Sequence, residues 1–232
     1  MPTVRATLSV RDRVVLAAAE LFMKQGFSNT SVKEISIESG VSENSIYYEM
    51  KTKEAIIAEL IGYVIERQRE IAVEKLKGIT DDKLFMYCFE KVLQLYIAEI
   101  NENIRELYTT VYSIPKTWDY IKEVNAEALK RVFGDRFPEL DFKDFYELEI
   151  ATGGIMRGYL TVPCNMYFTK KQKAKRYIET TLRIFNIDEE TINSVFKFII
   201  QFDFSKIAND TVNDLYNYFE RRIYEKNGHR ND

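Results

Sequence analysis

Residues 30–54 read TSVKEISIESGVSENSIYYEMKTKE, and this segment carries the clearest structural signal of the chain. Ser31 and Glu34 have the spacing of a capping box, in which each side chain accepts a hydrogen bond from the other residue's backbone N–H. A helix should therefore begin near Val32. Gly40 can adopt the left-handed conformation that ends a helix without steric cost. The pattern predicts one short helix between these points.

A second short helix is expected directly after the glycine. Ser42 occupies an N-cap position, Ile46 and Met50 then fall on one side of the helix, and Thr52 can cap a third helix. Helices this short are unstable alone in water, so a preceding helix over residues 11–24 must support them. Its apolar residues recur at helical spacing: Val14, Ala18, Leu21 and Phe22. Together these elements predict a compact helix-turn-helix unit.

Several short motifs stand in order along this part of the chain. They are Arg11–Phe22, Gly26-Phe27, Thr30-Ser31-Val32 with Ile35, Gly40-Val41-Ser42, Ser45-Ile46-Tyr47-Tyr48 and Lys51-Thr52-Lys53-Glu54. In this order and at this spacing they resemble the N-terminal domain of the TetR family of bacterial transcriptional regulators. The resemblance covers roughly residues 9–60. The remainder matches no motif residue by residue, which the family implies, since its ligand-binding domains diverge freely.

Composition bounds the other possibilities. The chain has 232 residues, of which 46% are apolar, so it can bury a substantial core. It contains no apolar run approaching the roughly 18–20 residues that cross a bilayer, and its N-terminus has no continuous apolar signal segment. We therefore expect a cytoplasmic protein with no membrane partner. Cys88 and Cys164 are too few and too far apart for a disulfide framework or a metal site, and two buried thiols are the simpler interpretation.

Enzymatic function finds little support in the residue inventory. His229 is the only histidine and lies four residues from the end, which excludes histidine-based metal sites and Ser-His or Cys-His nucleophile systems. The glycine fingerprints of nucleotide-binding loops and of serine hydrolases do not occur. We therefore predict no catalytic residue, no metal ligand and no cofactor. A carboxylate-only or tyrosine-based enzyme stays open, although no motif proposes one.

Net charge argues neither for nor against DNA. The chain carries −3 overall, and residues 1–53 hold seven Lys and Arg against six Asp and Glu, which leaves +1 there and −4 elsewhere. The asymmetry is small. A dimer that brings the lysines of this segment twice to one face could still neutralise several phosphates.

Beyond residue 53 the chain is expected to be almost all helix. Helices are predicted near residues 52–77, 81–101, 102–113, 117–133, 141–161 and 169–185, after Asp188, and over 211–226 with Gly228 past the end. The predicted fold class is all-α. Its domains are a helix-turn-helix DNA-binding domain over residues 1–53 and a larger helical ligand-binding and dimerisation domain over residues 54–232.

The family resemblance also assigns candidate DNA contacts by position. The candidates for base or nearby backbone contact are Ser42, Glu43, Asn44, Ser45 and Tyr47, and those for phosphate contact are Ser31, Lys33, Tyr48, Lys51 and Lys53. Lys53 also stands at the start of the long helix, where free N–H groups and the helix dipole favour an anion. An ordinary helical hairpin is the alternative, but exposed Tyr47 and Tyr48 on a short polar helix would then serve no packing purpose.

The resemblance further implies partners. Members of the TetR family are homodimers joined through C-terminal helices, and most are repressors released by a small molecule that alters the spacing of the two DNA-binding units. Two recognition helices related by a two-fold axis can enter successive major grooves about 34 Å apart, which gives a palindromic operator. The expected partners are thus a double-stranded DNA operator, a second copy of the chain and a small-molecule effector.

Aromatic side chains at helical spacing supply the candidate effector contacts. These are Tyr96, Tyr108, Tyr112, Trp118, Met156 and Tyr159. The alternative is ordinary core, because aromatic residues usually bury against one another. Many aromatics favour an apolar or aromatic effector, with a cationic one left open. On the helix near 141–161, we expect Gly154 and Gly158 to permit close packing, as at a subunit seam, and Glu149 and Arg157 to form an internal or intersubunit ion pair.

The acids of the second short helix depart from the family pattern. Glu49 stands where a histidine or another neutral or basic residue commonly precedes the Met50 position, and Glu43 adds a second acid. A carboxylate can accept from cytosine N4 in the major groove, yet it repels nearby phosphate. The alternative function is therefore a TetR-like helical protein that acts through protein–protein contact without specific DNA binding.

Overall fold

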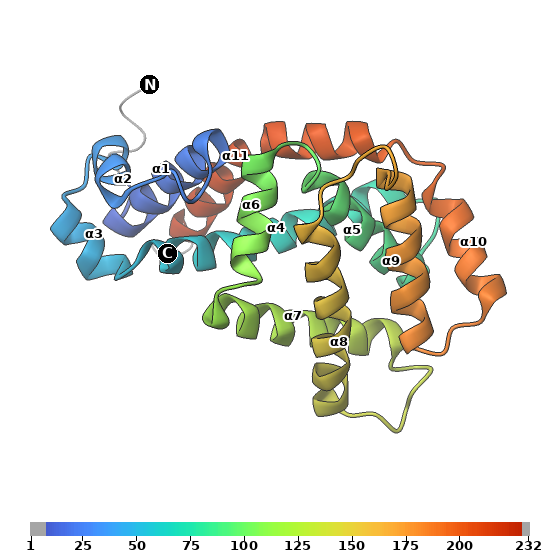
Figure 1. Ribbon diagram of the computed structural model, residues 1–232. Helices are drawn as coiled ribbons and strands as arrows, with labels where there is room; N and C mark the ends of the chain where they lie inside the picture. The colour runs from blue at the N-terminus through green and yellow to red at the C-terminus, as the bar shows by residue number, and fades with distance from the viewer. Residues whose placement is uncertain (1–7, 229–232) are drawn as a thin grey trace.

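The computed structural model describes residues 8–228, and within that range the chain forms eleven α-helices and no β-strand (Figure 1). The predicted all-α class is confirmed. The helices are α1 Val10–Gln25, α2 Val32–Ser39, α3 Glu43–Met50, α4 Lys53–Leu76, α5 Lys83–Ile97, α6 Glu102–Val111, α7 Pro115–Phe133, α8 Phe142–Thr161, α9 Lys170–Ile184, α10 Glu189–Ile199 and α11 Phe204–Gly228. Among these described helices, none is long and apolar enough to cross a bilayer.

The first three helices form the predicted helix-turn-helix unit. The Ser31 hydroxyl accepts from the Glu34 N–H, and the Glu34 carboxylate accepts from the Ser31 N–H, so the capping box is complete. Gly40 ends α2 with φ of 63°, in the left-handed region. Ser42 then caps α3 by accepting from the Ser45 N–H at 3.2 Å. The apolar faces of the three helices meet in a small core that contains Val14, Phe22, Ile35, Ile46 and Met50.

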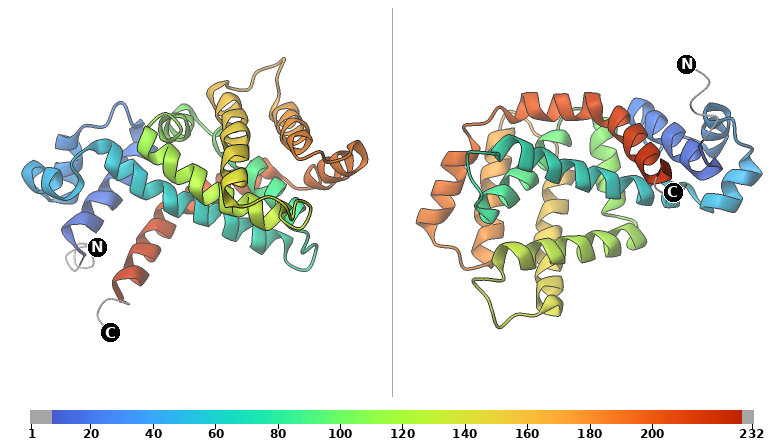
Figure 2. Two further views of the ribbon diagram at one scale, coloured as in Figure 1. Left: turned by 90° about the horizontal axis from the view of Figure 1, so that it is seen from below. Right: turned by 180° about the vertical axis from the view of Figure 1, so that it is seen from behind.

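The remaining helices form a larger body around α5. Helix α4 leaves the helix-turn-helix unit and runs along the body, where it packs against α5 (Figure 1). Helices α7 and α8 pack against each other, and α9 and α10 cover the other side of α5. Helix α11 returns along the body to lie against α1, as both views in Figure 2 show. The C-terminal helix therefore contacts the N-terminal unit.

Several helix boundaries differ from the sequence prediction; α5, for example, spans Lys83–Ile97 rather than 81–101. Helix α11 begins at Phe204, seven residues earlier than expected, and Gly228 is its last residue rather than a residue beyond it. The Asp203 carboxylate accepts from the Lys206 N–H at 3.0 Å and so caps this start. Phe204 anchors the first turn because its ring centroid lies 4.7 Å from that of Phe89 in α5. Helix α7 begins at Pro115, two residues early, since proline is well suited to a first helical position.

Candidate nucleic-acid interface

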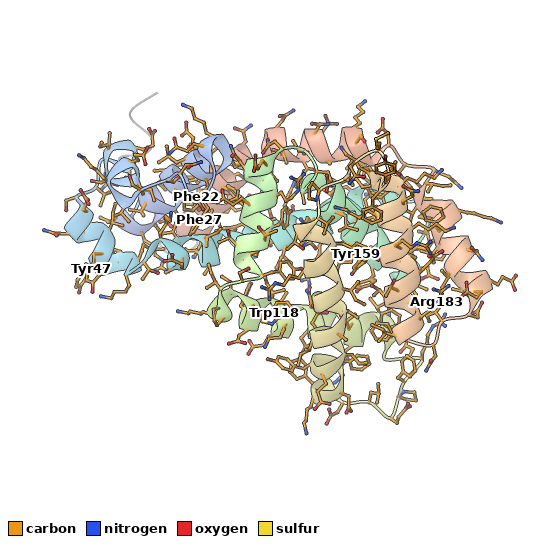
Figure 3. All side chains as sticks on the ribbon, viewed as in Figure 1. Phe22, Phe27, Tyr47, Trp118, Tyr159 and Arg183 are labelled. Atoms are coloured by element: carbon orange, nitrogen blue, oxygen red, sulfur yellow. The ribbon has the colours of Figure 1, made fainter. Side chains whose placement is uncertain are left out.

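Helix α3 presents its polar face away from the rest of the chain. Ile46 and Met50 are 3% exposed and hold the helix against the unit's core. The rings of Tyr47 and Tyr48 are instead 67% and 75% exposed, and Figure 3 shows Tyr47 at the end of the molecule farthest from the body. Asn44 is exposed near the start of the same helix. These polar and aromatic side chains cover no core, so they are available to a partner.

Positive charge lies beside the two tyrosines. Lys51 follows α3 with φ of 64°, and its Nζ lies 5.5 Å and 5.4 Å from the ring centroids of Tyr47 and Tyr48. Lys33 is exposed on α2. Lysine and tyrosine side chains are common donors to DNA phosphates. The exposed surface formed by Lys33, Tyr47, Tyr48 and Lys51, together with Asn44, is hereafter called the α3 surface.

The serine candidates are mainly helix caps. Both the hydroxyl and the N–H of Ser31 donate to Glu34 Oε2, at 2.7 Å and 2.8 Å. The backbone N–H of Ser31, and then its hydroxyl, hold the pKa of the Glu34 carboxyl below its usual range. Ser42 and Ser45 share a hydrogen bond of 2.9 Å between their hydroxyls. Ser31 would have to give up its bond to Glu34 before it could donate to phosphate.

The contacts of Lys53 differ from the phosphate contact that the sequence led us to expect. Its ammonium donates to the carbonyl oxygens of Phe27 and Thr30 at 2.7 Å and 2.8 Å, and it lies 4.1 Å from the centroid of the Phe27 ring. Two of its three donors are thus spent inside the unit. Lys53 ties the start of α4 to the loop between α1 and α2, where it satisfies two carbonyls. We withdraw it from the set of free phosphate-binding lysines.

The helix-turn-helix unit is joined to the body by polar contacts that the sequence did not indicate. Glu106 of α6 accepts from the Ser28 N–H at 3.0 Å, and Asn103 of the same helix donates to the Lys24 carbonyl at 2.9 Å. On the other side, Arg11 of α1 forms an ion pair of 2.7 Å with Glu59 of α4. All three contacts join residues at least 48 positions apart, so no local pattern could reveal them.

Two of the effector candidates, Tyr108 and Tyr112, are buried between α4, α5 and α6. The Gln68 amide donates to the Tyr108 hydroxyl, and the Gln94 amide donates to the Tyr112 hydroxyl at 3.2 Å. Burial raises the pKa of both phenols above its usual range, so both stay protonated. Their hydroxyls are already paired within the chain, as expected for structural tyrosines.

The other four candidates do not all share one cavity with them. Trp118, labelled in Figure 3, packs against Tyr112 with the two rings tilted and 5.4 Å between ring centroids. Met156 lines a small internal cavity with Tyr112, whereas Tyr159 lines an outer groove between α8 and α9. Tyr96 packs on Phe204 at the edge of α11. The six residues are therefore distributed over several environments, and their role as one effector site stays a prediction.

The expected ion pair between Glu149 and Arg157 is not formed within the chain. Glu149 is buried and accepts from the Asn125 amide at 2.8 Å and from the Thr152 hydroxyl at 2.7 Å. Burial raises the pKa of this carboxyl, although the nearby Lys91 ammonium opposes the shift. Arg157 is exposed. The two residues are eight positions apart on α8, which separates them by about 12 Å along the helix axis, and only Glu149 is buried.

Comparisons with known proteins follow the same division of the chain. Residues 14–60 match the profile of bacterial regulatory proteins of the tetR family. The chain is similar to the transcriptional regulator QacR of Staphylococcus aureus, with 29% identity over 107 residues, 45% of this chain and 57% of QacR. It is also similar to two Bacillus subtilis proteins. YerO, an uncharacterised transcriptional regulator, is 32% identical over 72 residues, and YttP, a probable one, is 28% identical over 161 residues.

These matches differ in coverage. The YerO match covers 31% of this chain and 24% of YerO, and the YttP match covers 67% and 70%. The chain thus spans little more than half of QacR and a quarter of YerO. The profile coincides with the part of the chain that the structure folds into α1, α2, α3 and the start of α4. The N-terminal helix-turn-helix unit of this all-helical chain is therefore the part that matches the tetR family of bacterial regulatory proteins.

Proposed function

We propose that this protein is a homodimeric transcriptional repressor that binds a palindromic DNA operator and is released by a small apolar or aromatic molecule. Residues 1–53 would bind DNA, and residues 54–232 would bind the effector and the second subunit. The observation that carries the proposal is the α3 surface, where two exposed tyrosines and Lys51 stand together on a helix that is already anchored by its buried face. A two-turn helix of this kind fits the major groove.

The exposed face of α8 supports the dimer. Ile150, Gly154 and Gly158 follow one another at four-residue spacing and are exposed. A Cβ added at either glycine would meet no atom of the chain within 4 Å. The adjoining groove between α8 and α9 is lined mainly by apolar residues, among them Tyr159 and Phe168. A small, partly apolar helix face of this kind permits close approach of a second backbone, so we place the subunit seam here.

Salt dependence of DNA binding tests the proposed function. Gel-shift titrations against the DNA flanking the protein's own gene should give a plot of log affinity against log salt with a steep negative slope. Each neutralised phosphate adds about 0.9 to that slope, and a dimer counts each contact twice. Binding that is weak and insensitive to salt would exclude an operator-binding role. An Ile150→Glu variant should run as a monomer in sedimentation and lose operator affinity with it.

The acids of α3 favour one alternative function. Glu43 and Glu49 are both exposed on the helix that should approach DNA. Their charges would repel phosphate, which agrees better with a surface that binds a basic protein partner. The same gel-shift titration separates the two functions. The protein-binding alternative would be favoured if the unaltered protein bound no DNA and a Glu43→Gln, Glu49→Gln double variant bound it clearly.

A further inference from the structure

An apolar cavity lies where the helix-turn-helix unit meets the body. It has a volume of about 60 Å³ and is lined by residues of α1, α4, α6 and α11 together with the last residue of α5. Fourteen residues line it, and all except Tyr108 are apolar. They include Phe22 of α1, Ile61 of α4, Leu107 of α6, and Leu215 and Phe219 of α11. Figure 3 marks Phe22 on α1, close to α6.

The wall of this cavity defines the chemistry of an occupant. The hydroxyl of Tyr108 is paired with Gln68, and no charged side chain lines the space. A charged or strongly polar molecule would lose its hydration there without gaining a partner, which is costly. Protein interiors are otherwise packed to the density of organic crystals, and apolar cavities take up compact apolar molecules.

The position of the cavity suggests a use for it. Its walls come from both parts of the molecule, with Phe22 and Met23 on the helix-turn-helix side and Ile104 and Leu107 on the body side. Helix α6 also carries Asn103, which bonds to the last turn of α1, and Glu106, which bonds to the loop after α1. An occupant that presses on α6 therefore acts on the same helix that holds the DNA-binding unit.

We propose that this cavity is the effector site, and that its ligand is a small neutral apolar molecule no larger than a one-ring aromatic hydrocarbon. The proposal rests on the proposed function in one respect, the release of the operator. Binding shifts the orientation of α1 relative to α6 because the ligand contacts both helices and so favours one arrangement of them over the other. The aromatic residues around Tyr112 and Trp118 then serve as core and not as effector contacts.

Methyl NMR with toluene as the probe tests the site without DNA. Toluene should shift the methyl signals of Met23, Leu107 and Leu215, which line the cavity. The matched controls are Met156, which lines a different internal cavity, and Met166, which is 82% exposed. Signals of both controls should stay in place. Absence of any shift, or shifts confined to Met156, would overturn the proposal.

A cavity-filling variant tests the coupling. Leu107 is partly exposed, so a Leu107→Trp ring can enter the cavity, and it should weaken toluene binding at least tenfold. Leu148→Trp is the control, because Leu148 is also partly exposed but lies on α8, away from this cavity. Toluene should release the operator from the unaltered protein and from Leu148→Trp but not from Leu107→Trp. If Leu107→Trp lowers the melting temperature, Val111→Ile adds one methylene to the wall and takes its place.

Failure of the inference and failure of the proposed function give different results. Toluene that shifts the cavity methyls but leaves operator affinity unchanged overturns the effector role and leaves DNA binding intact. A protein that binds no operator in the absence of toluene refutes the proposed function. The methyl shifts alone then decide whether the cavity is a binding site.

Discussion

The backbone N–H of Ser28 donates to Oε1 of Glu106 at 3.0 Å, and this bond joins the helix-turn-helix unit to α6 across 78 residues of sequence. Gly26 makes the approach possible. Its φ of 88° and ψ of 162° lie in a region that is essentially restricted to glycine, and a Cβ there would stand 2.5 Å from Oε2 of Glu106. A side chain at position 26 would therefore displace the Glu106 carboxylate, which helps to hold the DNA-binding unit against α6.

Substitution of Gly26 should accordingly cost more than substitution of Gly40. The Cβ added by Gly40→Ala meets no atom within 4 Å. This substitution should lower the unfolding free energy by about 1 kcal/mol, because alanine is strained at a left-handed φ. Gly26→Ala adds the clash with Glu106, so we expect about 2–4 kcal/mol and a weaker operator complex. Thermal melts and operator titrations of both variants measure this. Equal losses would mean that the contact with α6 is unimportant.

Loss of charge at Lys53 should affect stability, whereas loss of charge at Lys51 should affect the salt dependence of DNA binding. Lys53→Met removes two hydrogen bonds to buried or half-buried carbonyls and should cost about 1.5–3 kcal/mol of stability, with little change in the salt slope of DNA binding. Lys51→Met should leave stability unchanged and lower the slope by about 0.9 per half-site. Denaturant titrations and gel shifts at several salt concentrations separate the effects. A reduced slope in Lys53→Met would return Lys53 to the DNA interface.

Asn44 is expected to read a base. An asparagine at the start of a groove-facing helix can pair with the N6 and N7 atoms of adenine, and one such contact discriminates by about 1–3 kcal/mol. Asn44→Ala should therefore change the base preferred at one position of each half-site in a randomised operator library. A uniform loss of affinity across all sequences would instead mean that Asn44 positions the protein on the backbone.

The local features of the fold were predictable from the sequence, because each depends on residues three or four positions apart. The capping boxes of Ser31 with Glu34 and of Thr169 with Gln172 both form, as does the cap that Asp188 provides for α10. The spacing Phe204, Ile207, Ala208 also indicates a helix, but the polar residues among them concealed it. Helix ends marked by a cap or a glycine were placed to within a few residues.

The features that depend on tertiary contact were not predictable. Lys53 has the sequence position of a phosphate-binding lysine, yet the fold brings the Phe27 and Thr30 carbonyls within its reach. Periodicity placed Glu149 on an apolar helix but could not supply Asn125, 24 residues away, as its partner. The same aromatic residue types line the core and the pockets of the body, so their spacing in the sequence alone could not separate the two roles.

The ion pair of Glu99 and Lys173 should make the stability of the fold depend on pH. Glu99 accepts from Lys173 Nζ at 2.6 Å, from the Cys164 N–H at 3.0 Å and from Arg105 at 3.2 Å. Burial would raise the pKa of this carboxyl, but the bonds from Lys173 and Cys164 and the two positive charges together hold it below its usual value. A carboxylate with a lowered folded-state pKa contributes stability that is complete above the unfolded-state value, about 4.3, and is lost as pH falls through the folded-state value.

Glu99→Gln should therefore be less stable than the unaltered protein at pH 7, by about 3–5 kcal/mol, because Lys173 stays buried without a counter-charge. The difference should shrink as pH falls below about 4. Glu149→Gln is the matched control, since burial raises the pKa of Glu149. A carboxyl with a raised folded-state pKa stabilises the fold at low pH, and this contribution is lost as pH rises. The Glu149→Gln variant should therefore be at least as stable at pH 7 as the unaltered protein. Denaturant melts from pH 3 to pH 8 measure both trends, and a difference for Glu99→Gln that does not vary with pH would show that its charge is not coupled to folding.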